Sequence, residues 1–176
     1  GYCDLFGSAA DNCLDGDDRA AHGGTPFVQW YLQQVCSYQA AHGVRLVDYL
    51  DLHYYPQGDG VVDFSDPPNG SETAIISARR LRSLKELNDP AWDSESWLSD
   101  LGNSAPWHYS RPNLIPRVRA WIDASCPGTG LSISEYNWGA DNGASSALAQ
   151  AEALAIFARE GVDMAHRWVA PEPGSY

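Results

Sequence analysis

The sequence predicts an α/β protein whose parallel strands form a sheet or a (β/α) barrel. The first observation is the order of patterns along the chain, which runs helix, strand, helices, strand, helix, strand. The second is that all three strand-like segments begin apolar and end in polar and aromatic residues. Parallel strands of a barrel bring their C-terminal ends to one rim, where functional residues gather. The 176 residues suffice for one domain with a sizeable core.

The first segment, residues 1–24, predicts an acidic loop. It is rich in Gly, Asp and Asn, and it contains Asp11, Asp15, Asp17 and Asp18. Carboxylate oxygens bind calcium, so a structural calcium ion is one interpretation. The spacing does not match an Asp-x-Asp-x-Asp-Gly calcium loop, and we therefore favour a solvated loop.

A helix is expected from Thr25 to Gly43. Thr25 has the residue type of an N-cap, Pro26 suits the first turn, and Gly43 suits the C-cap. The next segment, residues 44–56, is rich in β-branched and aromatic residues and stops at a proline. This composition predicts a strand.

The rest of the chain predicts two more strands separated by helices. We expect a loop over 57–72, a helix over 73–87, an irregular stretch over 88–111, a helix over 114–124, a strand over 131–136, a helix from Ser145 or Ser146 to Glu160, and a strand over 162–168. The irregular stretch contains Trp92, Trp97 and Trp107. A loop of this length in a compact domain is usually functional.

The four cysteines, Cys3, Cys13, Cys36 and Cys126, do not form a metal-binding motif. Three pairings are open to them. A local bond between Cys3 and Cys13 is the easiest to close, which leaves Cys36 with Cys126. The alternative is four buried thiols, but the composition has the character of a secreted protein, and we expect at least one disulfide.

Charge and composition exclude several classes of function. The net charge is -12 and the pI is near 4.5, which argues against nucleic-acid and anionic membrane partners. No apolar run is long enough to span a bilayer. Acidic surfaces are common in secreted enzymes, so we expect an extracellular protein. The 7 Trp and 9 Tyr residues suit a groove that binds carbohydrate.

The most informative segment is Leu-Ser-Ile-Ser-Glu, residues 131–135, with Trp138 three positions further on. It predicts a strand that delivers the carboxylate of Glu135 to its C-terminal end beside an aromatic ring. Such a carboxylate can attack or shield the anomeric carbon of a sugar, and an indole face can stack on the sugar ring.

By alternation, each strand is predicted to point one set of side chains toward a common site. The sets are Val47, Tyr49, Asp51, His53 and Tyr55 in the first strand, Leu131, Ile133 and Glu135 in the second, and Val162, Met164, His166 and Trp168 in the third. Taken singly, His53, Tyr55 and Trp168 are equally well explained as packing residues. The same order in three strands favours a site.

The chain resembles glycoside hydrolase family 44. The resemblance rests on LDLHYYP, DPAWDSESWL, LIPRVRAWID and ISEYNWG in that order, followed by REGVD and RW, and it runs from about Thr25 to Trp168. Members are secreted endoglucanases and xyloglucanases with a (β/α)8 barrel and an added β-sandwich domain. By resemblance, Glu135 matches the nucleophile of a retaining mechanism, and the residues of HYYP and RW lie near it.

The chain departs from the family in one motif. The proton donor of the family follows an Asn in an Asn-Glu-Pro motif on an earlier barrel strand, and this chain has no such motif. Pro171-Glu172-Pro173 comes after the last strand and is not assigned that role. A complete barrel needs roughly 250 residues. The resemblance therefore implies that residues 1–176 are a partial catalytic domain, the C-terminal portion of the barrel with about strands 6 to 8, without the N-terminal strands and the β-sandwich domain.

The expected function is that of a retaining hydrolase acting on β-1,4-glucan backbones such as cellulose and xyloglucan, with the chain alone inactive for lack of the acid/base Glu. It requires no cofactor, with structural calcium left open, and its partner is the polysaccharide bound by a monomer. The expected catalytic residue is Glu135, and the expected substrate-binding residues are His53, Tyr55, Asn137, Trp138, Arg167 and Trp168. The alternatives are a non-catalytic carbohydrate-binding protein, an inactive fragment, and a barrel hydrolase acting on xylan or mannan.

Overall fold

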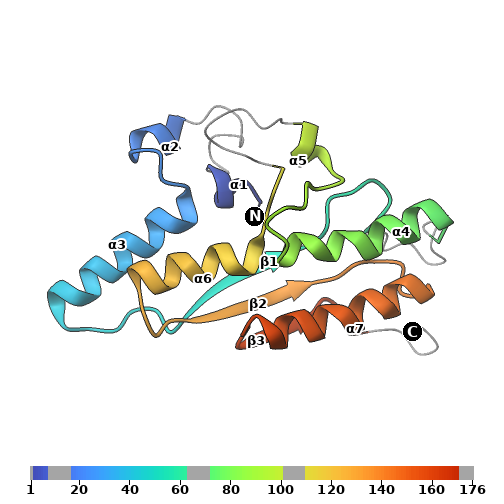
Figure 1. Ribbon diagram of the computed structural model, residues 1–176. Helices are drawn as coiled ribbons and strands as arrows, with labels where there is room; N and C mark the ends of the chain where they lie inside the picture. The colour runs from blue at the N-terminus through green and yellow to red at the C-terminus, as the bar shows by residue number, and fades with distance from the viewer. Residues whose placement is uncertain (1, 8–16, 63–71, 101–109, 171–176) are drawn as a thin grey trace.

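The helices of the molecule pack against a three-stranded parallel sheet (Figure 1). The computed structural model describes residues 2–7, 17–62, 72–100 and 110–170. The strands lie in the order β1-β2-β3 and comprise β1 (Tyr49–Tyr54), β2 (Gly130–Tyr136) and β3 (Met164–Arg167). Helices lie between consecutive strands in the sequence. The predicted α/β class with parallel strands is therefore confirmed.

The long helices fall where the sequence predicts them. The helices in the described part of the chain are α1 (Tyr2–Phe6), α2 (Asp17–Ala21), α3 (Phe27–His42), α4 (Ala74–Ser83) with the 3-10 turn η2 (Leu84–Leu87), α5 (Trp97–Asp100), α6 (Leu114–Ser125) and α7 (Ala144–Arg159). The short helices α1, α2 and α5 lie in segments predicted as irregular. A helix of four or five residues leaves too little periodicity to be recognised from sequence.

The ends of α3 and α7 differ in part from the prediction. Gly43 ends α3 with a φ of 65°, a left-handed conformation that suits Gly because it has no Cβ. The N-cap of α3 is Pro26 and not Thr25, and it makes no side-chain capping bond. The N-cap of α7 is Gly143, so Ser145 lies within the helix, where its hydroxyl contacts other side chains.

The first strand is shorter than predicted. Residues 44–47 do not join the sheet, because the backbone N–H groups of Leu46 and Val47 donate to the side-chain oxygen of Gln39 in α3. A backbone donor bound to a side chain is not available to a strand ladder. The β-branched composition that predicts a strand here belongs to the connection between α3 and β1.

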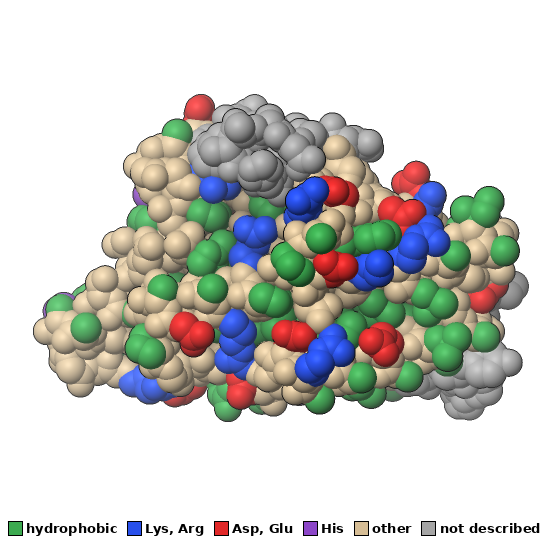
Figure 2. All heavy atoms as spheres, in the orientation of Figure 1, with side chains coloured by type: hydrophobic (Ala, Val, Ile, Leu, Met, Phe, Trp, Pro, Cys, Tyr) green, Lys and Arg blue, Asp and Glu red, His purple; other side chains and the backbone are tan. Residues whose placement is uncertain are grey.

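One face of the sheet carries the hydrophobic core, and the helices pack on that face. Tyr54 and Tyr136 are buried there, at the ends of β1 and β2. The other core residues include Leu50, Leu131 and Ile133 from the sheet, Leu32 from α3, Val118 and Ile122 from α6, and Ala149, Ala153, Ile156 and Phe157 from α7. Figure 2 shows Lys and Arg side chains interspersed with Asp and Glu on the surface seen in the orientation of Figure 1.

A disulfide joins Cys36 of α3 to Cys126 at the C-cap of α6, with 5.5 Å between their Cα atoms. It closes a loop of 90 residues and ties together two helices that cover the sheet. Cys3 is also disulfide-bonded, and Cys13 lies outside the described residues.

The acidic N-terminal loop lies mostly outside the described residues, which include its Asp17 and Asp18 at the start of α2. Within the part of the chain that the structure describes, no cluster of three His, Cys, Asp or Glu side chains is placed to hold a metal ion. In the same part, no helix is long and apolar enough to cross a membrane.

Candidate active site

The carboxylate of Glu135 is the centre of a small group of polar side chains at the C-terminal end of the sheet. The Tyr55 hydroxyl donates to Oε2 of Glu135 at 3.0 Å, and Nδ1 of His53 lies 3.2 Å from the same oxygen. The Glu135 side chain is 29% exposed, so the group is open to a ligand. The structure therefore brings His53 and Tyr55, at the end of β1, into contact with Glu135 of β2, as the sequence predicts.

The hydroxyl of Tyr55 is a stable donor in this arrangement. Partial burial, the hydrogen bond to Glu135 and the negative charge of Glu135 together raise the pKa of Tyr55 to about 12. The phenol consequently stays protonated at neutral pH and can donate its proton to a hydrogen bond with the Glu135 carboxylate.

This group lies on the face of the sheet that none of the described helices covers. The alternation predicted for β2 is wrong. Leu131 and Ile133 are each 1% exposed and lie in the core on the helix side, so they do not share a face with Glu135. The two neighbouring strands do expose residues from their predicted sets. These are Tyr49, Asp51 and His53 in β1, Met164 and His166 in β3, and Trp168 directly after β3.

A β-bulge in β2 explains the difference. Leu52 pairs with Ile133, and the next residue of β1, His53, pairs with Glu135, so Ser134 is an extra residue in β2. The register against β3 shifts at the same place. One extra residue reverses the alternation, because side chains in a strand repeat every two residues. The bulge therefore turns Glu135 away from the core and onto the open face.

Two residues predicted to bind substrate are buried instead. Trp138 is 2% exposed, its ring packs against Tyr54 and Tyr136, and its indole N–H donates to Ser83. Asn137 is 1% exposed, and its amide bonds the carbonyl of Trp168 and the backbone N–H of residue 139. Both stabilise the turn after β2 on the helix side, so neither presents a surface to a sugar in this structure.

The two residues at the end of β3 that were predicted to bind substrate differ from each other in exposure and contacts. Arg167 faces the helix side opposite Tyr136, and its guanidinium donates to Asp141 at 2.5 Å and to the carbonyl of Val169. It is thus an ion-pairing residue and not a free cation for substrate. Trp168 is 52% exposed at the end of the open face, where its ring is accessible.

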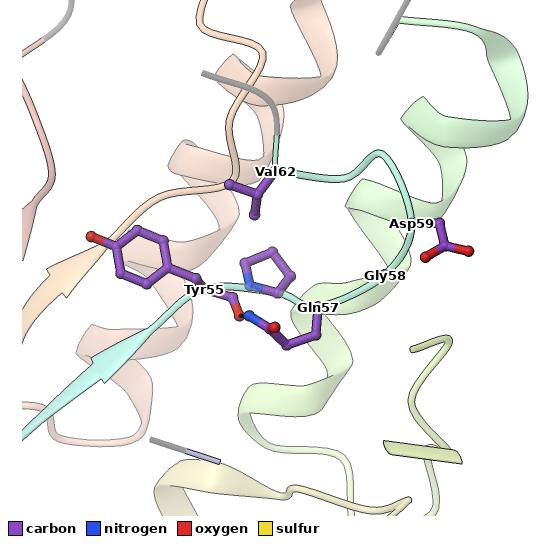
Figure 3. A pocket seen from close by; sticks show the side chains of 6 residues that line it. Tyr55, Gln57, Gly58, Asp59 and Val62 are labelled. Atoms are coloured by element: carbon purple, nitrogen blue, oxygen red, sulfur yellow. Dashed lines mark hydrogen bonds between the residues drawn. The ribbon is translucent and has the colours of Figure 1, made fainter. Parts of the chain in front are cut away.

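A hollow of about 530 Å³ adjoins Tyr55 at the end of β1 (Figure 3). Tyr55, Gln57, Asp59 and Val62 are among the residues that line it, and the carboxylate of Asp59 points away from the other three side chains. Trp97 stands beside it, since its indole N–H donates to the Gln57 amide oxygen at 3.3 Å. The Gln57 amide nitrogen in turn donates to the carbonyl of Tyr55 at 2.7 Å.

Comparisons of the sequence and of the overall structure with known proteins point to one family. The sequence model of Glycoside hydrolase family 44 matches residues 1–58. The bifunctional glucanase-xylanase CelM2 from a metagenome library is 34% identical, with a TM-score of 0.77 over 95% of this chain. A family 44 xyloglucanase of Paenibacillus polymyxa is 27% identical, with a TM-score of 0.72 over 90% of this chain. The beta-mannanase/endoglucanase A of Caldicellulosiruptor saccharolyticus is 33% identical over 100% of this chain.

The chain belongs to glycoside hydrolase family 44. It spans 13% of the Caldicellulosiruptor protein and 30% of each of the two solved chains.

Sequence reasoning does not identify two features near Glu135, the bulge in β2 and the place of Trp97. The bulge at Ser134 has no signature that alternation can detect, because an inserted residue changes the face without changing the composition. In the sequence, Trp97 is one of three Trp residues in a long irregular stretch, and nothing local separates it from the others. Its sequence neighbour Leu98 is fully buried, while Trp97 is 38% exposed, and this contrast becomes visible only in the fold.

Proposed function

We propose that this chain carries the nucleophile of a retaining glycoside hydrolase that cleaves β-1,4-glucan backbones of the cellulose and xyloglucan type. The observation that carries the proposal is the Glu135 carboxylate on the open face at the end of a parallel strand, held by Tyr55 at 3.0 Å. Relatives named as glucanase-xylanase, xyloglucanase and endoglucanase support the substrate class.

In the proposed mechanism, the ionised Glu135 attacks the anomeric carbon and forms a glycosyl ester. Among the described residues, the contacts of the carboxylate fall on Oε2, so Oε1 is the oxygen that attacks. Tyr55 and His53 keep the carboxylate in one orientation. A second carboxyl group, protonated and about 5–5.5 Å away, must donate to the leaving oxygen. The chemistry uses carboxyl groups alone and requires no cofactor.

We infer further that the sheet is the portion of a (β/α)8 barrel formed by about strands 6 to 8, and that residues 1–176 are a partial catalytic domain. Helices cover one face, and the inner face of a barrel lies opposite. The surface beside β1 supports this inference. There Phe27 and Tyr31 of α3 line an apolar groove with Tyr49, and each of the three is at least 38% exposed. A neighbouring barrel strand and its helix would cover this groove.

We propose that the exposed aromatic residues Trp168 and Trp97 contact the polysaccharide on either side of Glu135. Indole faces stack on the C–H faces of sugar rings. Among the described residues, the lining of the hollow beside Tyr55 offers the Tyr55 ring and the Gln57 amide, groups that suit a sugar unit.

We also propose that the protein is secreted and acts as a monomer. Disulfides persist in oxidising compartments and are rare in the cytosol, and the bond between Cys36 and Cys126 supports a secreted location. Any calcium site in the N-terminal loop would lie among Asp11, Asp15, Asp17 and Asp18 and would be structural.

The test of the proposed function is hydrolysis of an activated substrate, dinitrophenyl β-cellobioside. Dinitrophenolate leaves without a proton donor as the ester on Glu135 forms, so this first step needs only the nucleophile and the sugar-binding residues of the chain, and water then cleaves the ester. Release of dinitrophenolate from the cellobioside, but not from the matching galactoside, is expected. Binding of cello-oligosaccharides without any release would instead favour a carbohydrate-binding protein. Faster release from xylobioside or mannobioside would favour a xylan or mannan hydrolase.

Replacing Trp97 by Ala is expected to weaken the binding of cello-oligosaccharides roughly 3- to 10-fold, because one aromatic stacking contact is lost. Binding is measured by NMR titration with oligosaccharides of increasing length. Tyr38→Ala is the matched control, since Tyr38 is a 51% exposed aromatic residue near the far end of α3. Equal affinities for the two variants and the unchanged chain would show that Trp97 does not contact the sugar.

A further inference from the structure

The bulged residue of β2 needs a partner for its backbone. Ser134 is the residue added between Ile133 and Glu135, and it lies opposite a gap in the pairing with both β1 and β3. A bulge leaves an N–H group outside the strand ladder, and an unpaired backbone N–H costs free energy when it is shielded from water. A group of the protein that accepts from this N–H therefore stabilises the bulge.

The side chain of Asp51 supplies that partner from the neighbouring strand. The backbone N–H of Ser134 donates to Oδ1 of Asp51 at 3.1 Å, and the Ser134 hydroxyl donates to Oδ2. One carboxylate thus accepts from both donors of the bulged residue. Asp51 precedes His53 by two positions, so it lies on the same open face as the group around Glu135.

The carboxylate is held in the form that accepts two hydrogen bonds. Partial burial by itself raises the pKa of Asp51, but hydrogen bonds from Ser132 and Ser134 and the nearby His53 outweigh it, so the pKa lies below its usual value. Asp51 is consequently ionised at neutral pH.

We infer that Asp51 is a positioning residue for the proposed nucleophile, because it holds the bulge that places Glu135 on the open face within reach of Tyr55 and His53. In a regular strand without the bulge, Glu135, which follows Ile133 by two positions, would share the face of Ile133 and point into the helix-covered core. The inference rests on the proposed function for its catalytic consequence, whereas its structural part stands on the contacts of Ser134.

Three variants test this inference in the full chain. Asp51→Ala removes both acceptors, and Asp51→Asn keeps one carbonyl oxygen for the Ser134 N–H. Asp48→Ala is the control, because Asp48 is an exposed aspartate three positions earlier that pairs with Arg45. The measurements are kcat and KM on dinitrophenyl β-cellobioside, and hydrogen exchange of the Ser134 amide by NMR.

Asp51→Ala is expected to lower kcat roughly 10- to 100-fold with little change in KM, since a displaced catalytic group costs turnover more than binding. The Ser134 amide should exchange faster in this variant. Asp51→Asn should recover most of kcat and of the amide protection, and Asp48→Ala should match the unchanged chain in both.

An unchanged kcat in Asp51→Ala would overturn the inference, and so would an unchanged exchange rate of the Ser134 amide. If the unchanged chain releases no dinitrophenolate, the proposed function is wrong. The inference is then decided by the exchange rate together with the Tyr55–Glu135 distance in a crystal structure of Asp51→Ala. A distance that stays at 3.0 Å would contradict it.

Discussion

Replacing Glu135 by Gln is expected to lower the hydrolysis of dinitrophenyl β-cellobioside by roughly 10⁴-fold or more, the scale of loss seen when a nucleophile is removed. Gln has nearly the same shape and keeps an acceptor for Tyr55, but its neutral amide does not attack the anomeric carbon. The melting temperature should change little, because the side chain lies on the open face. A near-normal rate in this variant would remove Glu135 from the reaction.

A smaller side chain gives a second readout of the same role. In Glu135→Ala the vacated space should admit azide, and added azide should restore release of dinitrophenolate with an α-glycosyl azide as the product. The control is Glu152→Gln, which changes an exposed glutamate of α7. It should leave the rate unchanged and give no azide effect.

The chain by itself is expected to leave xyloglucan and carboxymethylcellulose uncut, even where it hydrolyses the dinitrophenyl substrate. A sugar leaving group must depart as an alkoxide unless an acid protonates it, and loss of general acid catalysis costs about 10²–10⁴-fold. The chain lacks the Asn-Glu-Pro motif that carries the acid in this family. The barrel strands that we infer to be absent would also supply part of the rim that orients the polysaccharide.

The measurement is the number of reducing ends released by the purified chain over a day. Turnover that disappears in Glu135→Gln would show that another carboxylate of this chain supplies the proton. Glu172 would be the first to test, although it lies outside the described residues.

The sequence predicts the elements of this fold better than the directions of its side chains. The helix that ends at Gly43 and the strand before Glu135 follow from local patterns that the tertiary structure keeps. The strand predicted over 44–56 starts late, because Gln39 accepts the N–H groups of residues 46 and 47. That contact joins two elements, and no local pattern contains it.

The sequence predicts only part of the candidate site, because contacts between separate elements decide which of its side chains are exposed. His53, Tyr55 and Glu135 are in contact, as their common place at strand ends predicts. Trp138 was assigned to the site through its place in the ISEYNWG motif, but the chain turns back after β2 and buries it against Tyr54. Alternation alone places Glu135 on the same face as Leu131 and Ile133, whereas the bulge at residue 134 places it on the opposite, open face beside His53.

The most direct test of the account is to trap and locate the proposed glycosyl ester. Dinitrophenyl 2-deoxy-2-fluoro-β-cellobioside carries a leaving group that speeds formation of the ester, and its fluorine slows hydrolysis by destabilising the oxocarbenium-like transition state. Mass spectrometry of the intact chain, followed by peptide mapping, then identifies the modified residue. A single fluorocellobiosyl adduct on Glu135, absent in Glu135→Gln, is expected. An adduct on another carboxylate, such as Asp51, or release of dinitrophenolate without any adduct, would contradict it.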